Sequence, residues 1–285
     1  MSRPTPRWRV LGLALATTTL LTLGAKAPDR LHLVILYPGG PSVEGEGAKL
    51  IEQFSTTLAE MTGLSSASLK GVYFNQLEPA EKYLATHRDA YIMGSLGFYL
   101  SRRAQLDLIP LARLMLSSAV EDRYFLMVRK GRYSSLDQLK GKSVTGSVLA
   151  DDPRFLSRLV FEGKLDVNDH FTLKPTSRPL SAVRKVSRDK VDAVLLNNMQ
   201  HSSLKALPVA DELEVLHRSP GLPPLGLMMV DTPKTRMHKE TVVKAVSAMC
   251  DTEKGKPICT SFGFAGFAPL RPDDLATVVA TYDKQ

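Results

Sequence analysis

Cysteine is scarce in this sequence, and its histidines are not grouped as metal ligands are. The two cysteines, Cys250 and Cys259, lie nine positions apart. In an exported protein an even, local pair favours a disulfide, and a catalytic thiol is the alternative. No histidine has a metal-ligand spacing such as H-E-x-x-H, so surface or helix-capping roles are expected for this residue type. We expect neither a metal nor another cofactor.

Complete catalytic motifs are also missing, although two glycine-containing turns come close. The segment 40–45 has the glycine spacing of a phosphate-binding loop, but Glu46 stands where that loop needs a lysine to grip the phosphate. The segment 93–97 resembles a nucleophile elbow in which Met93 replaces the first glycine. Ser95 is therefore either a nucleophile or, as we favour, a helix-capping serine. We do not expect an enzyme.

Only the start of the chain contains an apolar run that approaches the length of a membrane span. Arg3, Arg7 and Arg9 precede an apolar run over 10–23, and Ala-Lys-Ala at 25–27 fits a cleavage site. This arrangement predicts a secretory signal peptide over residues 1–27, removed after Ala27, and hence a periplasmic protein. An uncleaved membrane anchor is the alternative, but the run is short of the ~20 apolar residues that a span needs.

The positive charge of the chain does not predict nucleic-acid binding. The net charge is +8, and it falls to +4 when Arg3, Arg7, Arg9 and Lys26 are removed with the signal peptide. The remaining basic residues are scattered among Asp and Glu and do not form a stripe with aromatic residues between them, as a nucleic-acid groove would need. A solvated basic surface explains this charge.

Strand and helix patterns alternate through the first hundred residues. The segment 31–37, LHLVILY, is a continuous apolar run, as in a strand covered on both faces. A helix with apolar residues over 50–61 ends at Gly63, and strands at 69–74 and 89–94 flank a helix that begins near Glu78. This alternation predicts an α/β fold, a parallel sheet with helices on both faces.

The segment Ser135 to Asp152 is the central candidate for a ligand site. Ser135 and Gln138 have capping-box spacing, which predicts a short helix that ends at Gly141. A strand over 142–147 follows, and Asp152 with Pro153 predicts the start of the next helix. In open α/β sheets ligands bind in loops at the carboxyl ends of strands, next to positively polarised helix N-termini.

The rest of the chain continues the same pattern. We expect strands at 108–116, 124–129, 171–174, 191–196, 213–217 and 225–230, and helices at 154–161, 180–186, 234–250 and 272–282.

The order of these elements, together with LDQLKGKSV, VDAVLLNN and SPGLPPLGLMMV, resembles the phosphate/phosphonate-type periplasmic solute-binding proteins of ABC transporters. The resemblance covers nearly the whole mature chain. It implies a type II periplasmic binding protein fold, in which two α/β lobes, each a mostly parallel sheet flanked by helices, are joined by two crossover strands. Lobe 1 is expected to hold 28–120 and 226–285, lobe 2 to hold 121–225, and the crossings to lie near 119–128 and 220–230.

The chain departs from the pattern of that family at two places and keeps it at a third. Where the family has a hydroxyl-rich S-T-S-G turn, this chain has Leu149-Ala150-Asp151-Asp152, whose carboxylates satisfy the helix N-terminus and repel an anion. Met93 stands at the place of an aromatic residue of the family. Asp192 keeps an acidic residue that the family uses for polar or amine groups of the ligand. The alternatives are a plain helix cap for Asp152 and a strand residue that caps the next turn for Asp192.

We therefore expect an exported protein that closes its lobes on a small polar molecule other than phosphate and presents it to an ABC permease. A receptor of the same fold that docks on a membrane sensor is the alternative. We expect a monomer with no nucleic-acid partner. The residues expected to contact the ligand lie at strand ends: Tyr37, Gly94, Ser95, Ser147, Asp152, Asp192 and Asn197.

Overall fold

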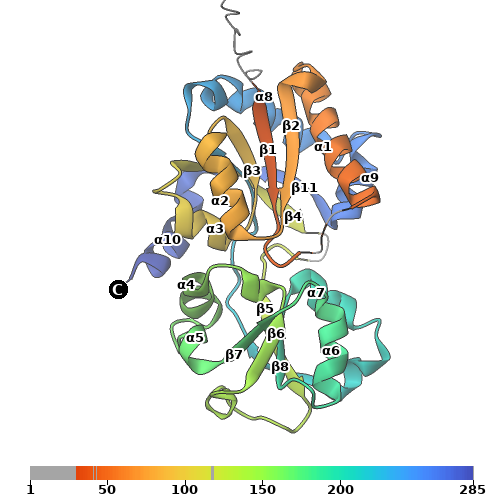
Figure 1. Ribbon diagram of the computed structural model, residues 1–285, viewed down its shortest axis with the longest axis vertical. Coiled ribbons are helices and arrows are strands. Elements are labelled where there is room, and N and C mark those ends of the chain that lie inside the picture. The colour runs from red at the N-terminus through yellow and green to blue at the C-terminus, as the bar shows by residue number, and fades with distance from the viewer. Residues whose placement is uncertain (1–29, 41, 43, 117–118, 285) are drawn as a thin grey trace, which may run out of the picture.

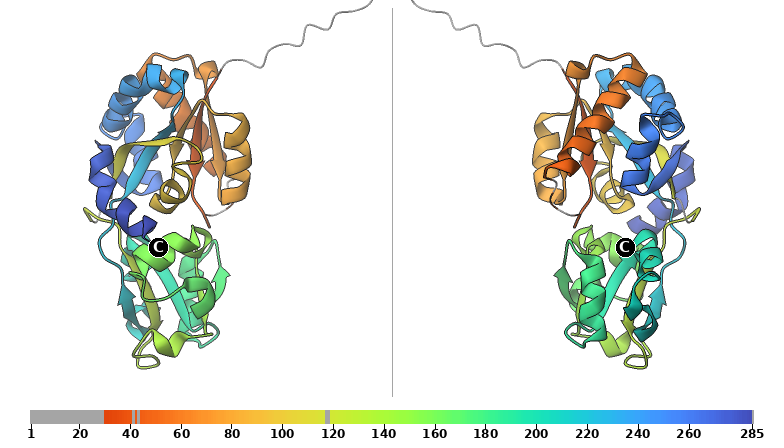
Figure 2. Two further views of the ribbon diagram at one scale, coloured as in Figure 1. Left: turned by 90° about the vertical axis from the view of Figure 1, so that its left-hand side faces the viewer. Right: turned by 90° about the vertical axis from the view of Figure 1, so that its right-hand side faces the viewer.

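The computed structural model describes residues 30–284 except 41, 43, 117 and 118. The predicted signal peptide, residues 1–27, lies outside the described residues. The described chain forms two α/β lobes stacked along the long axis of the molecule, as Figures 1 and 2 show. The predicted two-lobed α/β fold is confirmed.

The first lobe is built on a six-stranded sheet with the order β11-β4-β10-β3-β1-β2. Its strands are β1 (Leu31–Leu36), β2 (Leu69–Phe74), β3 (Ala90–Met93), β4 (Leu108–Leu116), β10 (Leu225–Val230) and β11 (Phe264–Pro269). Its helices are α1 (Glu46–Thr62), α2 (Leu77–Thr86), α3 (Leu96–Arg102), α8 (Pro233–Met249) and α9 (Gly255–Phe262).

Strand β1 is buried along its whole length because helices cover both faces of the sheet. Leu33 and Ile35 pack with α1, α8 and α9, whereas Val34 and Leu36 point to the opposite face and pack with α2 and α3. Side chains that alternate between the two faces of a strand therefore serve two separate cores.

The second lobe has a five-stranded sheet with the order β7-β6-β8-β5-β9. Its strands are β5 (Tyr124–Arg129), β6 (Ser143–Gly146), β7 (Thr172–Pro175), β8 (Ala193–Asn197) and β9 (Leu213–Arg218). Its helices are α4 (Pro153–Phe155), a π-helical continuation at Leu156–Val160, α5 (Val167–His170), α6 (Pro179–Ser187) and α7 (Asn198–Leu204).

Both sheets are mixed rather than mostly parallel. β1 pairs parallel with β2 and β3, and β6 pairs parallel with β7 and β8. The antiparallel pairs involve β10 and β11 in the first lobe and β5 and β9 in the second. β5 enters the second lobe and β10 returns to the first, so each runs against the direction of the strands it joins.

The two segments that cross between the lobes are hydrogen-bonded to each other. The backbone N–H of Asp122 donates to the carbonyl of Leu222 at 2.9 Å, and the N–H of Leu222 donates to the carbonyl of Asp122 at 2.8 Å. Ser219 and Tyr124 exchange a similar pair, because Ser219 N–H donates to Tyr124 O and Tyr124 N–H donates to Ser219 Oγ, both at 2.9 Å. This pairing joins the two lobes. It leaves few backbone positions in the crossing segments that are free to bend.

Several local predictions need correction. The capping box at Ser135 is wrong, because Gln138 Oε1 accepts from the backbone N–H of Ser134 at 2.8 Å and the helix is a 3-10 turn at Asp137–Leu139. The helix expected over 154–161 is π-helical in its second half. Helices α7 and α9 and strand β11 were not expected. The disulfide between Cys250 and Cys259 is confirmed, with an S–S distance of 2.01 Å, and it joins the end of α8 to α9.

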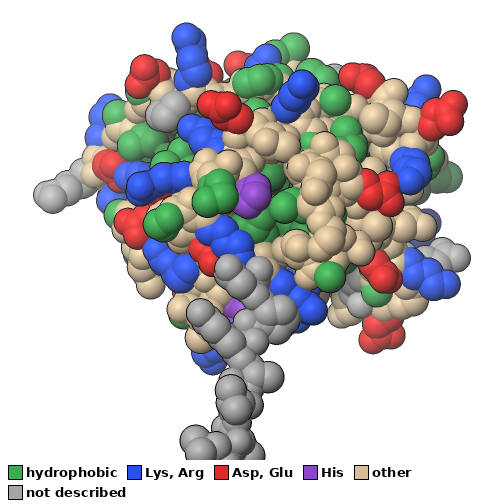
Figure 3. Space-filling model, turned by 90° about the horizontal axis from the view of Figure 1, so that it is seen from above, with side chains coloured by type: hydrophobic (Ala, Val, Ile, Leu, Met, Phe, Trp, Pro, Cys, Tyr) green, Lys and Arg blue, Asp and Glu red, His purple; other side chains and the backbone are tan. Residues whose placement is uncertain are grey.

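Charged side chains of both signs are interspersed on the face of the first lobe seen in Figure 3. This distribution agrees with the absence of a basic stripe in the sequence. Among the described residues, no helix is long and apolar enough to cross a membrane.

The C-terminal helix, α10 (Ala276–Asp283), lies beside the junction of the two lobes (Figure 1). The Tyr282 hydroxyl donates to Asp152 Oδ1 of the second lobe at 3.1 Å, and Arg158 Nη1 donates to the Tyr282 carbonyl at 2.7 Å. Asp283 forms an ion pair with Arg103 of the first lobe. Although residues 226–285 were expected in lobe 1, this helix contacts both lobes.

We predict that Tyr282→Phe loosens the contact between the lobes. The change removes one hydrogen bond to a carboxylate, worth about 1–2 kcal/mol, and leaves the buried ring in place. Small-angle scattering of the ligand-free variant should show a larger radius of gyration than that of the parent.

The matched control is Tyr133→Phe, which removes a tyrosine bond to a carboxylate, that of Asp192, within the second lobe only. The radius of gyration of the Tyr133→Phe variant should equal that of the parent. Equal scattering from both variants would show that the hydrogen bond from Tyr282 to Asp152 does not restrain the lobes.

Candidate ligand-binding site

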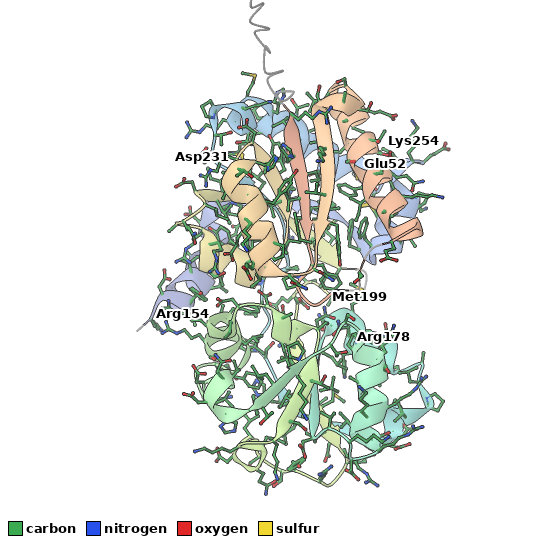
Figure 4. All side chains as sticks on the ribbon, in the orientation of Figure 1. Glu52, Arg154, Arg178, Met199, Asp231 and Lys254 are labelled. Atoms are coloured by element: carbon green, nitrogen blue, oxygen red, sulfur yellow. A yellow bond between two sulfur atoms is a disulfide. The ribbon has the colours of Figure 1, made fainter. Side chains whose placement is uncertain are left out.

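A cavity of about 240 Å³ lies between the lobes, next to the crossing segments. The carboxyl ends of β1 and β3 face it from the first lobe, and those of β6 and β8 face it from the second. It is lined by five of the predicted ligand residues, Tyr37, Gly94, Ser95, Ser147 and Asn197. Met199 of α7 also lines it and lies at the junction of the lobes in Figure 4.

A polar network beside the cavity links Tyr37 of the first lobe to Ser147 of the second. Gln200 Nε2 donates to Ser147 Oγ at 2.8 Å and lies 3.5 Å from the Tyr37 hydroxyl. Gln200 is held by a capping box with Asn197 at the start of α7. The sequence held a signal for Gln200, since Asn197 and Gln200 have the three-residue spacing of such a box.

The loop after β1 approaches the second lobe closely. Gly39 has a φ of +68°, and a Cβ atom added to it would lie 2.2 Å from the carbonyl oxygen of Ser147. Only glycine fits this position, because both the backbone conformation and the closeness of the other lobe exclude a side chain. The lobes are therefore in contact at the rim of the cavity.

Ser95 has the capping role that the sequence favoured. Its Oγ accepts from the backbone N–H of Phe98 at 3.1 Å at the start of α3. The same hydroxyl is hydrogen-bonded to the carboxylate of Asp151 from the second lobe. Asp151 also packs against Gly97, where an added Cβ would meet Asp151 Oδ1 at 2.5 Å. Asp151 thus brings a carboxylate of one lobe against a helix turn of the other.

The cavity holds a second carboxylate, that of Asp122 in the first crossing segment. It is hydrogen-bonded by the backbone N–H groups of Arg123 and Asn198 and by the Tyr124 hydroxyl. Burial raises the pKa of Asp122 and of Asp151 from 3.8 to about 6, although these hydrogen bonds partly oppose the effect. Sequence reasoning missed Asp122, because nothing in the sequence separates it from an ordinary loop aspartate.

Two predicted ligand residues lie away from the cavity. Asp152 caps α4, since its Oδ1 accepts from the Phe155 N–H at 2.8 Å, as the alternative prediction held. Asp192 precedes the amino end of β8, whereas Asn197 at the carboxyl end of the same strand lines the cavity. It accepts from Ser143 N–H at 2.9 Å and from the Tyr133 hydroxyl at 2.5 Å, and it pairs with Arg132. Neither side chain lines the cavity.

Met93 lines the cavity at the place where the resembling family has an aromatic residue. Among the described residues, no group of three or more His, Cys, Asp or Glu is arranged to hold a metal ion.

A family model described as the periplasmic substrate-binding protein of phosphonate ABC transporters matches residues 48–275. The chain belongs to this family. Phosphonate-binding proteins of this kind are substrate-binding proteins of the periplasm that work with a membrane permease, so the solute-binding interpretation is supported. No curated protein sequence matches the chain.

Solved structures share the fold of this phosphonate-binding-protein family member at low sequence identity. A Xanthomonas citri protein bound to ATP is 14% identical, with a TM-score of 0.69, and covers 89% of this chain and 97% of its own. A binding-protein component of an ABC phosphonate transporter from Pseudomonas aeruginosa is 13% identical, with a TM-score of 0.66 and coverages of 89% and 85%. PhnD1 of Prochlorococcus marinus, in complex with methylphosphonate, is 14% identical, with a TM-score of 0.62 and coverages of 89% and 97%.

We predict that Asp151→Asn stabilises the ligand-free protein at about pH 7.5 and that the gain shrinks as the pH falls. The pKa of Asp151 in the folded protein lies above its unfolded value of 3.8. The free-energy cost of burying the charged carboxylate is therefore fully present above about pH 6 and disappears below pH 3.8. The difference in unfolding free energy between variant and parent should change by up to about 3 kcal/mol across this range. Denaturant unfolding at a series of pH values measures it.

Asp231→Asn is the control with the opposite sign. Hydrogen bonds from Arg236 lower the pKa of Asp231, so this carboxylate stabilises the fold above its unfolded pKa and loses that effect as the pH falls. The loss of unfolding free energy caused by Asp231→Asn should therefore become smaller as the pH falls. A gain for Asp151→Asn that does not vary with pH would contradict the assignment of a buried charge.

Proposed function

We propose that this protein is an exported receptor that captures a small molecule between its lobes and delivers it to an ABC permease, and that phosphate is not its molecule. Export follows from the predicted signal peptide, with cleavage after Ala27. The protein is proposed to act as a monomer. A membrane sensor as the partner is the alternative for the same fold, and the family description favours the permease.

The observation that carries the proposal is the carboxylate of Asp151 on the cavity wall. PhnD1 of Prochlorococcus marinus is solved with methylphosphonate, an anion. In this chain a carboxylate lies against Ser95 and Gly97, and the lining residues that the structure describes include no Lys, Arg or His. Two like charges about 4 Å apart repel by roughly 4 kcal/mol at an effective dielectric of 20, with no cation to offset the cost.

We expect inorganic phosphate and methylphosphonate to bind weakly or not at all. Isothermal titration calorimetry with the parent should show no heat of binding at about millimolar ligand. The binding free energy would then be weaker than about −4 kcal/mol. Asp151→Ser replaces the repelling carboxylate by a hydroxyl and should gain affinity for phosphate, whereas Asp152 must stay because it caps α4. Micromolar phosphate binding to the parent would contradict the proposal.

Capture also requires that the lobes close around the ligand. We predict that Gly39→Ala keeps the lobes apart, because the new methyl group meets the Ser147 carbonyl. Small-angle scattering should give a larger radius of gyration for this variant and a smaller response to ligand.

Gly131→Ala is the matched control, since Gly131 has a similar φ of +74° and an added Cβ there meets nothing within 4 Å. Both variants carry the same backbone strain, but only Gly39→Ala opposes closure. If the two variants scatter alike, the contact at Gly39 does not control closure.

A further inference from the structure

The two carboxylates on the cavity wall have no cationic partner among the described residues. Asp122 accepts from two backbone N–H groups and the Tyr124 hydroxyl, and Asp151 accepts from the Asp152 N–H and the Ser95 hydroxyl. Neither is in an ion pair with a described residue, in contrast to Asp192 with Arg132. Neutral donors leave the negative charge of a carboxylate in place, so the cavity keeps a negative potential.

The remaining wall is mostly apolar and aromatic. It includes aliphatic side chains from both crossing regions and from the first lobe, and five aromatic rings. Such a wall favours a ligand with a hydrocarbon or ring body, and the faces of aromatic rings attract cations.

We propose that the cavity selects an organic cation with an apolar body, of the class of aryl- and alkylammonium ions. This inference rests on the proposed function and names its ligand class. A cation replaces the missing partner of the two carboxylates, while its body occupies the apolar wall.

Other ligand classes fit these observations less well. A neutral molecule leaves both carboxylates without a counter-charge. A zwitterion such as an amino acid brings a carboxylate of its own into a wall that has no described Lys, Arg or His to pair with it. An anion adds repulsion from Asp122 and Asp151.

The first experiment compares three probes that share one ring and differ in charge: benzylamine, benzyl alcohol and benzoate. Isothermal titration calorimetry with the full mature protein at about pH 7.5 should show benzylamine binding at least about tenfold more tightly than benzyl alcohol, and benzoate not binding. Benzyl alcohol or benzoate binding as tightly as benzylamine would overturn the inference.

The pH dependence gives an independent readout. Because the pKa values of Asp122 and Asp151 are about 6, both carboxyls become protonated at about pH 5, and benzylamine affinity should fall there while that of benzyl alcohol stays constant. Tyr124 faces Asp122, and Ser95 and Asp152 face Asp151. The two other titratable groups on the described wall are Tyr37 and Tyr73, which do not lose their protons in this range. Benzylamine affinity that is equal at both pH values would contradict the role of the carboxylates.

Substitutions of the two cavity carboxylates test whether their charges cause the preference for a cation. Asp122→Asn and Asp151→Asn keep the shape and one acceptor oxygen of each side chain but remove its charge. Each should weaken benzylamine binding by about tenfold or more and leave benzyl alcohol binding within about twofold of the parent. Asp231→Asn, at an exposed ion pair beside α8, should bind all three probes as the parent does. Unchanged benzylamine affinity in both cavity variants would overturn the proposal.

Scattering separates this inference from the function on which it rests. If benzylamine and tetraethylammonium both fail to bind while a neutral or anionic compound closes the lobes, the cation class is wrong and the receptor function stands. If benzylamine binds with the expected charge dependence but leaves the radius of gyration unchanged at saturation, the cation class stands and capture by closure is wrong. If neither cation binds and no compound closes the lobes, both are wrong.

Discussion

The contact of Asp151 with the turn at Ser95 and Gly97 is the constraint around which the cleft is arranged. It places a nearly buried carboxylate of the second lobe on the first lobe. Burying a charge this way is costly unless hydrogen bonds compensate, and the donors here are the Asp152 N–H and the Ser95 hydroxyl. The lobes thus meet through a carboxylate that also lines the cavity, and we propose that its charge selects the ligand.

The other contacts between the lobes are numerous but individually weak. The crossing segments are paired, Gln200 links Ser147 to Tyr37, and α10 contacts both lobes through Tyr282. Each neutral hydrogen bond contributes about 0.5–1.5 kcal/mol net, so a ligand with modest preference for the closed state is able to shift the population of open and closed forms. One apolar core includes Phe98 of the first lobe and Phe155 of the second, so the lobes also share buried apolar contacts.

The fold was largely predictable because its signals are local. The unbroken apolar run of β1 reports a strand with two covered faces, and Asp152 with Pro153 marks a helix start with a side-chain cap. Elements with weaker local signals escaped prediction. Strand β11 contains Ala265 and Gly266 among its apolar residues, and its pairing with β4 comes from a segment about 150 residues earlier in the chain.

The candidate site was predicted only in part, and the reason is geometric. Tyr37, Gly94, Ser95, Ser147 and Asn197 follow the carboxyl ends of strands, where the topology of an open sheet places ligands, so the sequence alone identified them. Asp192 stands at the amino end of its strand, and the order of residues does not show that Ser143 and Arg132 reach it there. Which of two neighbouring aspartates faces the cavity was likewise decided by packing, because Asp152 is committed to the start of α4 while Asp151 is turned toward the other lobe. The sequence by itself determined the alternation of strands and helices and the loops that follow the strands, since these depend on local patterns, and the two-lobed fold was implied by the resemblance to a known family. Only the tertiary structure decided that Asp122 and Asp151 share one cavity, because their proximity depends on how the lobes close on each other.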